Sequence, residues 1–329
     1  MELIKSLCDI IIDSKKLYKI IEVIPNGIVS SPSAFNLEED GDILGIGIPK
    51  EKYLKIFKNS HDYFYAHFDQ LLNLEGLSKA NLVDAYYMTL GYLISTNEHH
   101  TIIKLHSRIV NILQNYDQDL ELISCFLTCR MSRINKSSSL WVLLQRLILK
   151  SHQETRPCLD PKYMLRAIKS CDLHFSNYYG NSFLRWYSAI DETGIAKRAE
   201  WFDVFVSLCH SKLSDSSLWS SFNFILRIRA GRDIQTPLEE LSPSNQNVDR
   251  DYHSAANHEI VVAELKWLFD VECKYITPYK LLILLLDSSD QLEQIEQSLH
   301  KCKGISQETK DKLSKTVLDH IDDISSRAR

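Results

Sequence analysis

One lysine of this chain stands where a positive charge could act in chemistry. Lys136 comes directly before a segment with helical periodicity that starts near Ser138. The first N–H groups of a helix lack intrahelical partners and carry the positive end of the helix dipole. An ammonium group beside them favours a bound anion, and a diphosphate in particular. The alternative is a solvent-exposed lysine in a loop.

A pair of tyrosines is the second candidate for contact with another molecule. Tyr178 and Tyr179 open the helix expected at 178–191, which we interpret as the inner member of a helix pair. Side chains at the start of an inner helix can face out of a concave surface. We therefore expect this pair to contact a ligand or a partner.

Metal ligation and nucleophilic catalysis have weaker support. Cys125 and Cys129 lie four residues apart on an expected helix, and His99 and His100 are adjacent at a turn. Structural zinc sites usually use Cys-x2-Cys pairs on turns, and no second half of such a site is visible. Core thiols and helix-start histidines are therefore favoured. The chain also has no Gly-x-Ser-x-Gly motif and no recognisable nucleophile elbow.

The elements that carry these residues recur with a period. A short sequence phrase recurs, most clearly as 136–141 (Lys-Ser-Ser-Ser-Leu-Trp), 177–186 and 215–219 (Asp-Ser-Ser-Leu-Trp). Taking Trp141 as the anchor of one copy, the other copies are anchored at Leu105, Asn181 and Trp219, with separations of 36, 40 and 38 residues. Such a period is typical of helical arrays, in which each helix pair buries its apolar faces against its neighbours. We therefore predict an all-α fold, a right-handed α–α superhelix of antiparallel helix pairs. Four tryptophans at helical core spacing are expected to pack between the layers: Trp141, Trp186, Trp219 and Trp267.

The pattern predicts two regions. Residues 1–51 are expected to form an N-terminal helix over 1–24 and an irregular segment over 25–50, with turn signals such as Ser30-Ser31-Pro32-Ser33 and a short strand at 43–48. Residues 52–329 are expected to form the solenoid. Its helix pairs are predicted at 81–96 with 99–114, 119–134 with 138–151, 160–175 with 178–191, and 196–213 with 216–229.

The array is expected to be interrupted once before it ends. Residues 230–257 are polar and rich in turn signals, which favours a flexible insertion. Helical periodicity resumes over 258–275, and the apolar segment 279–286 is expected to be a buried inner helix. Two polar helices, separated by Lys303-Gly304, are typical of a terminal capping repeat.

Composition limits the classes of function. Among 329 residues, 44% are hydrophobic and 25% are charged, and the net charge is −5, which argues against a broad electrostatic grip on nucleic acid or anionic lipid. The eight cysteines are scattered among apolar residues, as expected of buried free thiols in a reducing compartment. The longest apolar run, 281–286, is too short to span a bilayer. We expect a cytoplasmic protein without an integral membrane segment.

The period and the phrase resemble the alpha-subunit repeat of protein prenyltransferases, whose inner helix carries a pattern close to Asn-Tyr-x-x-Trp-x-x-Arg-Arg-Trp. The best copy runs from Asn177 to Trp186, with Asn181 in place of the usual tryptophan. The second copy keeps Lys136 and Trp141, and the fourth keeps the tryptophan without the arginine pair. The chain is most similar to the alpha subunit of a type III protein geranylgeranyltransferase.

The resemblance implies a heterodimer that is inactive without its second chain. A beta subunit would supply the zinc and the apolar funnel for the isoprenoid, so no cofactor is expected in this chain. Lys136, five residues before Trp141, would approach geranylgeranyl diphosphate and stabilise the departing diphosphate, while Tyr178 and Tyr179 would line the same region. The acceptor would be a protein with a C-terminal cysteine. The alternatives are a non-catalytic helical-repeat scaffold or adaptor, and a farnesyltransferase alpha subunit.

Overall fold

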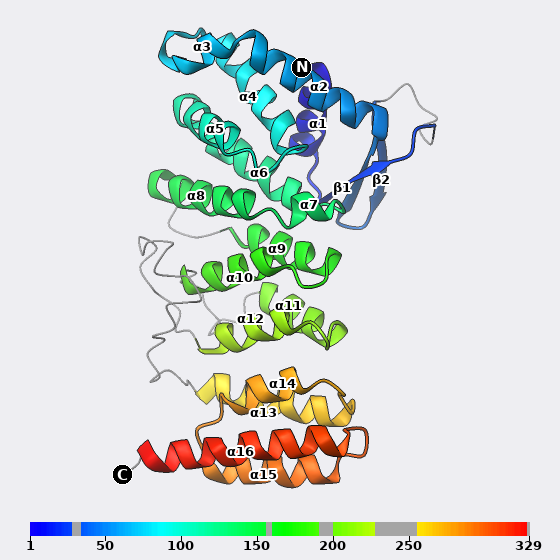
Figure 1. Cartoon of the computed structure of the whole chain (residues 1–329), viewed down its shortest axis with the longest axis vertical. Helices are drawn as coiled ribbons and strands as arrows, with labels where there is room; N and C mark the ends of the chain where they lie inside the picture. The colour runs from blue at the N-terminus through cyan, green and yellow to red at the C-terminus, as the bar shows by residue number, and fades with distance from the viewer. Residues whose placement is uncertain (28–33, 156–159, 191–199, 228–254, 328–329) are drawn as a thin grey trace. The chain divides into compact units, whose positions relative to one another are not determined.

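The computed structural model describes residues 1–27, 34–155, 160–190, 200–227 and 255–327. The chain divides into two compact units, Met1–Phe183 and Leu184–Arg329, and each is described by itself (Figure 1). Residues 230–254 of the expected insertion and the turn signal at 30–33 lie outside the described residues. The boundary expected near residue 51 stays a prediction.

The described residues form sixteen α-helices and three strands, so the mostly helical character is confirmed. The first unit contains α1 (Glu2–Asp13), α2 (Lys50–Ala66), α3 (Phe68–Leu72), α4 (Lys79–Leu93), α5 (His100–Leu113), α6 (Tyr116–Leu127), α7 (Ser132–Asn135), α8 (Ser138–Thr155), α9 (Pro161–Leu173) and the first residues of α10 (Tyr178–Ile190). The second contains the rest of α10 and α11 (Glu200–Ser211), α12 (Ser216–Arg227), α13 (Ala255–Asp270), α14 (Ile276–Ile283), α15 (Ser289–Lys301) and α16 (Gln307–Arg327). Helices adjacent in sequence pack on one another within each unit, as α4 does on α5 and α15 on α16.

A small sheet corrects the all-α prediction. The strands are β1 (Tyr18–Ile24), β2 (Asn36–Asp40) and β3 (Ile43–Pro49), in the order β1-β3-β2. β1 runs parallel to β3 and β2 runs antiparallel to it. The strand expected at 43–48 is confirmed. The helix expected over 1–24 was wrong beyond Asp13, because the β-branched segment 18–24 finds its pairing partner about 25 residues later in the chain.

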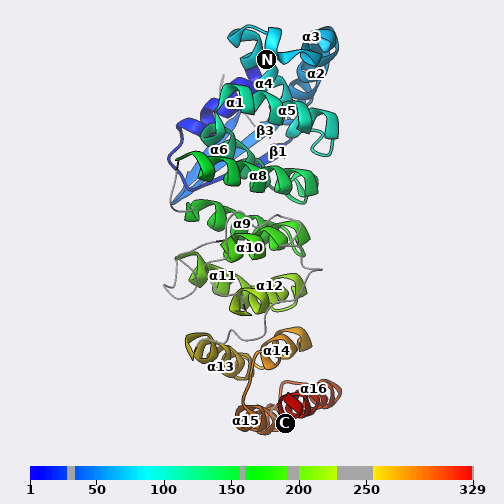
Figure 2. The ribbon, with the colours of Figure 1, turned by 90° about the vertical axis from the view of Figure 1, so that its left-hand side faces the viewer.

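The sheet packs on the helices of the first unit. β1 lies against α6, and α2 contacts both β1 and β3 (Figures 1 and 2). Ile21 and Ile46, which face each other across the β1–β3 pair, are fully buried. The backbone N–H of Arg130 donates to the carbonyl of Ile21 at 2.9 Å. The N-terminal segment is therefore part of one core with the helices that follow it.

The recurring phrase marks the starts of α8, α10 and α12. The residue four positions before each anchor, Ser137, Asn177 or Asp215, is an N-cap whose side-chain oxygen accepts from the N–H three residues further on, at 3.2, 3.0 and 3.3 Å. The N–H of each anchor then bonds to the carbonyl of its cap. The copy at Leu105 is out of register, because α5 is capped by His99, six residues earlier. The phrase thus encodes a cap and a buried residue in the first helical turn.

The anchor and core tryptophans behave mostly as expected. Trp141, Trp186 and Trp219 are buried, and the indole N–H of Trp141 donates to the carbonyl of Asn135 at 2.8 Å. Trp267 is only half-buried and stacks on His210, with ring centroids 3.6 Å apart. Burial of the first three is confirmed.

We predict a measurable cost for losing one of these caps. Asp215 is buried and its Oδ1 accepts from the N–H groups of Ser217 and Leu218 at 3.0 and 3.3 Å. Replacing Asp215 with alanine should lower the free energy of unfolding of the second unit by about 1–2 kcal/mol. Urea denaturation followed by tryptophan fluorescence measures this loss. Asp215→Asn keeps a capping oxygen and should lose less; equal losses for both variants would show that the cap is not the cause.

Candidate functional site

Lys136 lies at the end of α7, beside the start of α8. Its side chain is half-buried, and its Nζ donates to the backbone carbonyl of Phe175 at 2.8 Å. That carbonyl belongs to the turn before α10. The hydrogen bond from Lys136 therefore connects the start of α8, in the second copy of the phrase, to the start of α10, in the third copy. The structure therefore brings Lys136 close to the segment that carries Tyr178 and Tyr179.

The first turn of α8 is already occupied by a carboxylate of this chain. Glu98 accepts from the hydroxyls of Ser137 and Ser139, both at 2.6 Å, and from the backbone N–H of Ser139 at 3.4 Å. Partial burial raises the pKa of Glu98, but the hydrogen bonds from Ser137 and Ser139 outweigh it and hold this pKa below its usual value. The expected anion site beside Lys136 is thus filled by Glu98.

The two tyrosines face solvent at the start of α10. Tyr178 and Tyr179 are exposed, and their rings meet edge to face with centroids 5.4 Å apart. Phe175, three residues earlier, is exposed as well. Their positions suit contact with a partner, and that role stays a prediction.

The cysteine and histidine candidates belong to the core and to a helix cap. Cys125 and Cys129 are fully buried, and the seven described cysteines are free thiols. His99 caps α5, its Nδ1 accepting from the N–H of Ile102 at 3.4 Å. In the described part of the chain, no group of three or more His, Cys, Asp or Glu side chains is placed to hold a metal ion.

A buried set of polar residues was missed by the sequence patterns. Thr89, His106 and Asp119 are fully buried. The two ring nitrogens of His106 lie 2.8 Å from Thr89 Oγ1 and 3.0 Å from Asp119 Oδ1, and the Tyr86 hydroxyl donates to the same carboxylate oxygen at 3.0 Å. The order hydroxyl–imidazole–carboxylate is that of a nucleophilic triad. Because all of these side chains are enclosed, we assign them to the stability of α4, α5 and α6.

A second missed cluster connects β1 to the helices. The carboxylate of Glu121 accepts from both terminal nitrogens of Arg166, at 2.6 and 2.9 Å, and from Lys19 Nζ at 2.5 Å. Arg166 and Lys19 are buried, and Arg166 Nε also donates to the carbonyl of Leu17 at 2.8 Å. The three charges therefore fix β1, α6 and α9 to one another.

An open groove of about 330 Å³ between α5, α6 and α8 is the best candidate for a binding site. Its floor is apolar and formed by Val110, Leu143 and Leu147, which are buried. On α8 the lining positions recur three and four residues apart, because one face of a helix repeats at that interval. The apolar surface that a ligand could contact is therefore that of the half-buried Leu149 and of the aliphatic parts of Arg146 and Lys150 above this floor.

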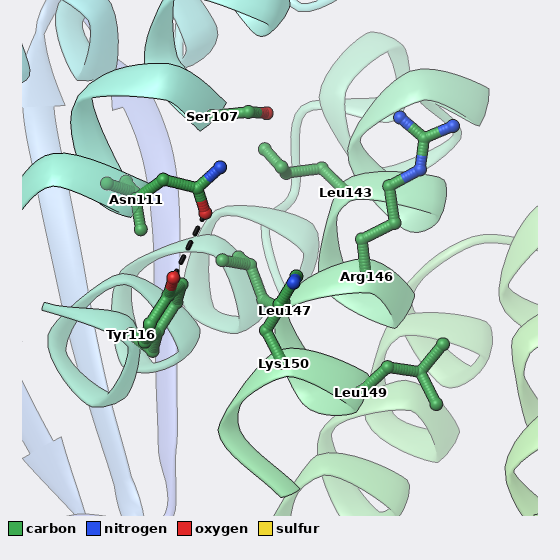
Figure 3. A pocket seen from close by; sticks show the side chains of 9 residues that line it. Ser107, Asn111, Tyr116, Leu143, Arg146, Leu147, Leu149 and Lys150 are labelled. Carbon is green, nitrogen blue, oxygen red and sulfur yellow. Dashed lines mark hydrogen bonds between the residues drawn. The ribbon is translucent and has the colours of Figure 1, made fainter. Parts of the chain in front are cut away.

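The rim of the groove is polar and basic. Arg146 and Lys150 rise from α8 beside the apolar floor, and Ser107 and Asn111 face them from α5 (Figure 3). The Tyr116 hydroxyl donates to Asn111 Oδ1 at 3.0 Å, which leaves the amide N–H groups of Asn111 free to donate elsewhere. The rim thus supplies hydrogen-bond donors and positive charge.

The positive charge of the groove is not neutralised by the described residues. Arg146 and Lys150 are exposed, and neither forms an ion pair with a residue that the structure describes. Lys104 and Arg108 on α5 are also exposed and form no such pair. In a chain of net charge −5, this groove is a local site of positive charge suited to an anionic ligand.

Two consecutive models of one family match the chain. The ECM9 N-terminal domain matches residues 1–128, and the ECM9 middle domain matches residues 140–250, which together cover more than half of the chain. The chain belongs to the ECM9 family. The groove lies at the junction of these two domains, because α5 and α6 fall in the ECM9 N-terminal domain and the groove residues of α8 in the ECM9 middle domain.

The chain is also similar in sequence to an ECM9 protein of yeast. The chain is 30% identical over 205 residues to Protein ECM9 of Saccharomyces cerevisiae (strain ATCC 204508 / S288c), which covers 58% of this chain and 51% of that protein. The chain therefore spans about half the length of this ECM9 relative.

These matches correct the functional expectation. The families found are the ECM9 domains, so the assignment to the prenyltransferase alpha-subunit repeat was wrong. The expectations that depended on this assignment are therefore wrong as well: the geranylgeranyl transfer activity, the beta-subunit partner and the acceptor protein with a C-terminal cysteine. The physical reason is that the phrase encodes helix caps and first-turn core residues, which any stacked array of helices needs. That this chain holds no cofactor stays a prediction.

Among the described residues, no helix combines the length and the apolar character needed to cross a bilayer.

Proposed function

We propose that this ECM9-family chain is a non-catalytic binding module whose groove between α5, α6 and α8 holds an acidic, partly apolar segment of another protein. The observation that carries the proposal is an apolar floor beside two cations, Arg146 and Lys150, that form no ion pair with any residue the structure describes. Carboxylates of the ligand would meet these cations, while its apolar side chains would cover Leu149 and the aliphatic parts of Arg146 and Lys150.

A polypeptide fits this groove better than a small molecule does. Small-ligand sites usually enclose most of the ligand surface, whereas this groove is open along two helices. An amphipathic helix can lay its apolar face between α5 and α8, as in helix-in-groove recognition. The exposed Val142 lies one helical turn before Arg146 on α8 and adds to the apolar surface beside the groove.

The proposal includes the arrangement and the compartment. We infer that the helix pairs stack as a right-handed α–α superhelix, which is supported by the packing of sequential helices within each unit. We also infer a reducing compartment such as the cytoplasm, which is supported by the free, buried state of the described cysteines.

Binding of labelled model peptides tests the proposed function. We would measure fluorescence anisotropy with two amphipathic helical peptides of about 14 residues, identical in their leucines but carrying either glutamate or lysine on the polar face. The glutamate peptide should bind with a dissociation constant of about 10–100 μM. Its affinity should fall as salt is added, since exposed charges are screened.

Charge reversal in the groove is expected to remove this selectivity. The double variant Arg146→Glu, Lys150→Glu should bind the glutamate peptide at least about tenfold more weakly, which corresponds to about 1.4 kcal/mol. Both side chains are exposed, so the fold should be kept. Lys79→Glu, at an exposed position of α4 outside the groove lining, is the matched control. Equal affinity for both peptides, or an unchanged affinity in the double variant, would contradict the proposal.

A further inference from the structure

An apolar stripe runs along α2 and α3 on the surface of the first unit. It consists of Leu54, His61 and Tyr65 on α2, which share one face because they are spaced by seven and four residues, and of Phe68 and Leu72 on α3, which follows α2 after His67. Figure 1 shows α2 and α3 following one another along the edge of this unit. The other face of α2 packs on α4, with Ile56 and Phe64 buried.

The stripe is unusually exposed for residues of its type. Leu54 is 54% exposed, Tyr65 65%, Phe68 42% and Leu72 62%. Single exposed apolar residues are common on protein surfaces, but a contiguous row of them marks an interaction site. The rings of His61 and Tyr65 pack on each other, with their centroids 4.6 Å apart. The row therefore presents a preformed surface.

Basic side chains lie near the start of the stripe, and acidic side chains lie near its end. The first half of α2 carries Lys50, Lys52, Lys55 and Lys58 with a single acid, Glu51. The segment 59–75 carries Asp62, Asp69 and Glu75 and contains no lysine or arginine. Lys55, Lys58 and Asp69 form no ion pair with any described residue. On α2, Lys58 lies between Leu54 and His61 on the stripe itself, and Asp69 lies on α3 at its far end, so the surface is basic toward one end and acidic toward the other.

We propose that this stripe is the interface between two copies of the chain, paired antiparallel about a two-fold axis. A surface that is basic at one end and acidic at the other is complementary to itself only when the second copy is reversed. The proposal concerns a surface separate from the groove and does not depend on what the groove binds.

The register of the pairing follows from the spacing. If the axis crosses the stripe at the level of Tyr63, residues equally far from it on opposite sides face each other across the proposed interface. Leu54 then lies opposite Leu72, and Lys58 lies opposite Phe68 and next to Asp69. Each copy contributes both members of the Lys58–Asp69 pair, so the interface contains that pair twice.

Sedimentation velocity of the full chain over a range of concentrations tests the pairing. The wild-type chain should change from monomer to dimer with a dissociation constant of about 10 μM. The variant Tyr65→Ser, Leu72→Ser should dimerise at least about tenfold more weakly, because it removes two exposed anchors. Leu318→Ser, at an exposed leucine of α16, is the control and should dimerise like wild type. A wild-type chain that stays monomeric at about 100 μM would overturn the proposal, as would a stripe variant that dimerises normally.

A charge-swap experiment distinguishes this register from any other contact. Lys58→Glu and Asp69→Lys should each weaken self-association about tenfold, because each places like charges opposite each other twice. An equal mixture of the two variants should form a heterodimer with wild-type affinity, since both pairs are then of opposite sign. A mixture that associates no better than the single variants would overturn the antiparallel register. Circular dichroism confirms that the variants are folded.

Discussion

Replacing Glu121 with glutamine is expected to lower the free energy of unfolding of the first unit by about 3 kcal/mol near neutral pH. The carboxylate holds Arg166 at 2.6 and 2.9 Å and Lys19 at 2.5 Å, and both cations are buried. Without it, two positive charges remain out of water with no counter-charge. Urea denaturation monitored by the fluorescence of Trp141, the tryptophan of this unit, measures the loss.

The pH dependence of the loss identifies its electrostatic cause. Burial raises the pKa of Glu121, but hydrogen bonds and charge from Arg166 and Lys19 outweigh it and lower this pKa to about 2. A depressed carboxyl pKa stabilises the fold fully above the unfolded value of 4.5, and the stabilisation is lost as pH falls toward 2. The difference between wild type and Glu121→Gln should therefore be largest above that unfolded pKa and shrink at lower pH.

A surface pair provides the matched control. Glu22 pairs with Arg130 at 3.3 Å, and both side chains are largely exposed. Glu22→Gln should cost less than about 1 kcal/mol. If Glu121→Gln and Glu22→Gln cost the same, or if the loss is independent of pH, the buried network does not stabilise the unit as inferred.

Replacing Asp119 with alanine is expected to destabilise the first unit by about 3 kcal/mol. The carboxylate accepts from the Tyr86 hydroxyl at 3.0 Å and lies 3.0 Å from His106 Nε2. Burial, and then the charge of Asp119, raise the pKa of Tyr86 well above its usual value, so its hydroxyl stays protonated and donates. Alanine would leave these two buried groups without their acceptor. Denaturation with the same fluorescence readout measures the effect.

The controls for Asp119 separate hydrogen bonding from helix propensity. Asp84→Ala, at an exposed position of α4, should change the free energy of unfolding by less than about 0.5 kcal/mol. Asp119→Asn keeps one acceptor oxygen and should fall between wild type and Asp119→Ala. A stability of Asp119→Ala close to that of wild type would show that the triad-like set contributes nothing to the fold.

Parts of the candidate sites could be found in the sequence and parts could not. The exposure of Tyr178 and Tyr179 was expected from their place at the start of an inner helix, and both are exposed, while their contact with a partner stays a prediction. Glu98 could not be linked to Ser137 and Ser139, since it lies about 40 residues earlier in the chain. The groove is assembled from three helices, and no single segment of the sequence carries its pattern. Arg146 stands out only because it lies beside an apolar floor and forms no ion pair with the described part of the chain.

The sequence by itself determined the local elements. The caps Ser137, Asn177 and Asp215 fixed the starts of α8, α10 and α12, because a cap acts on N–H groups two or three residues away. The strand over 43–48 and the burial of three tryptophans follow from equally short patterns.

Only the tertiary structure decided what those elements do together. It paired 18–24 with 43–49 as parallel strands and placed Glu98 at the first turn of α8. It also left the groove cations without a counter-charge among the described residues. It also showed that a phrase resembling a catalytic repeat is a pattern of caps and core residues. The physical reason is the separation along the sequence over which each interaction acts. Capping and helical periodicity act between residues within about one helical turn. Strand pairing, charge neutralisation and grooves depend on residues far apart in the sequence that only folding brings together.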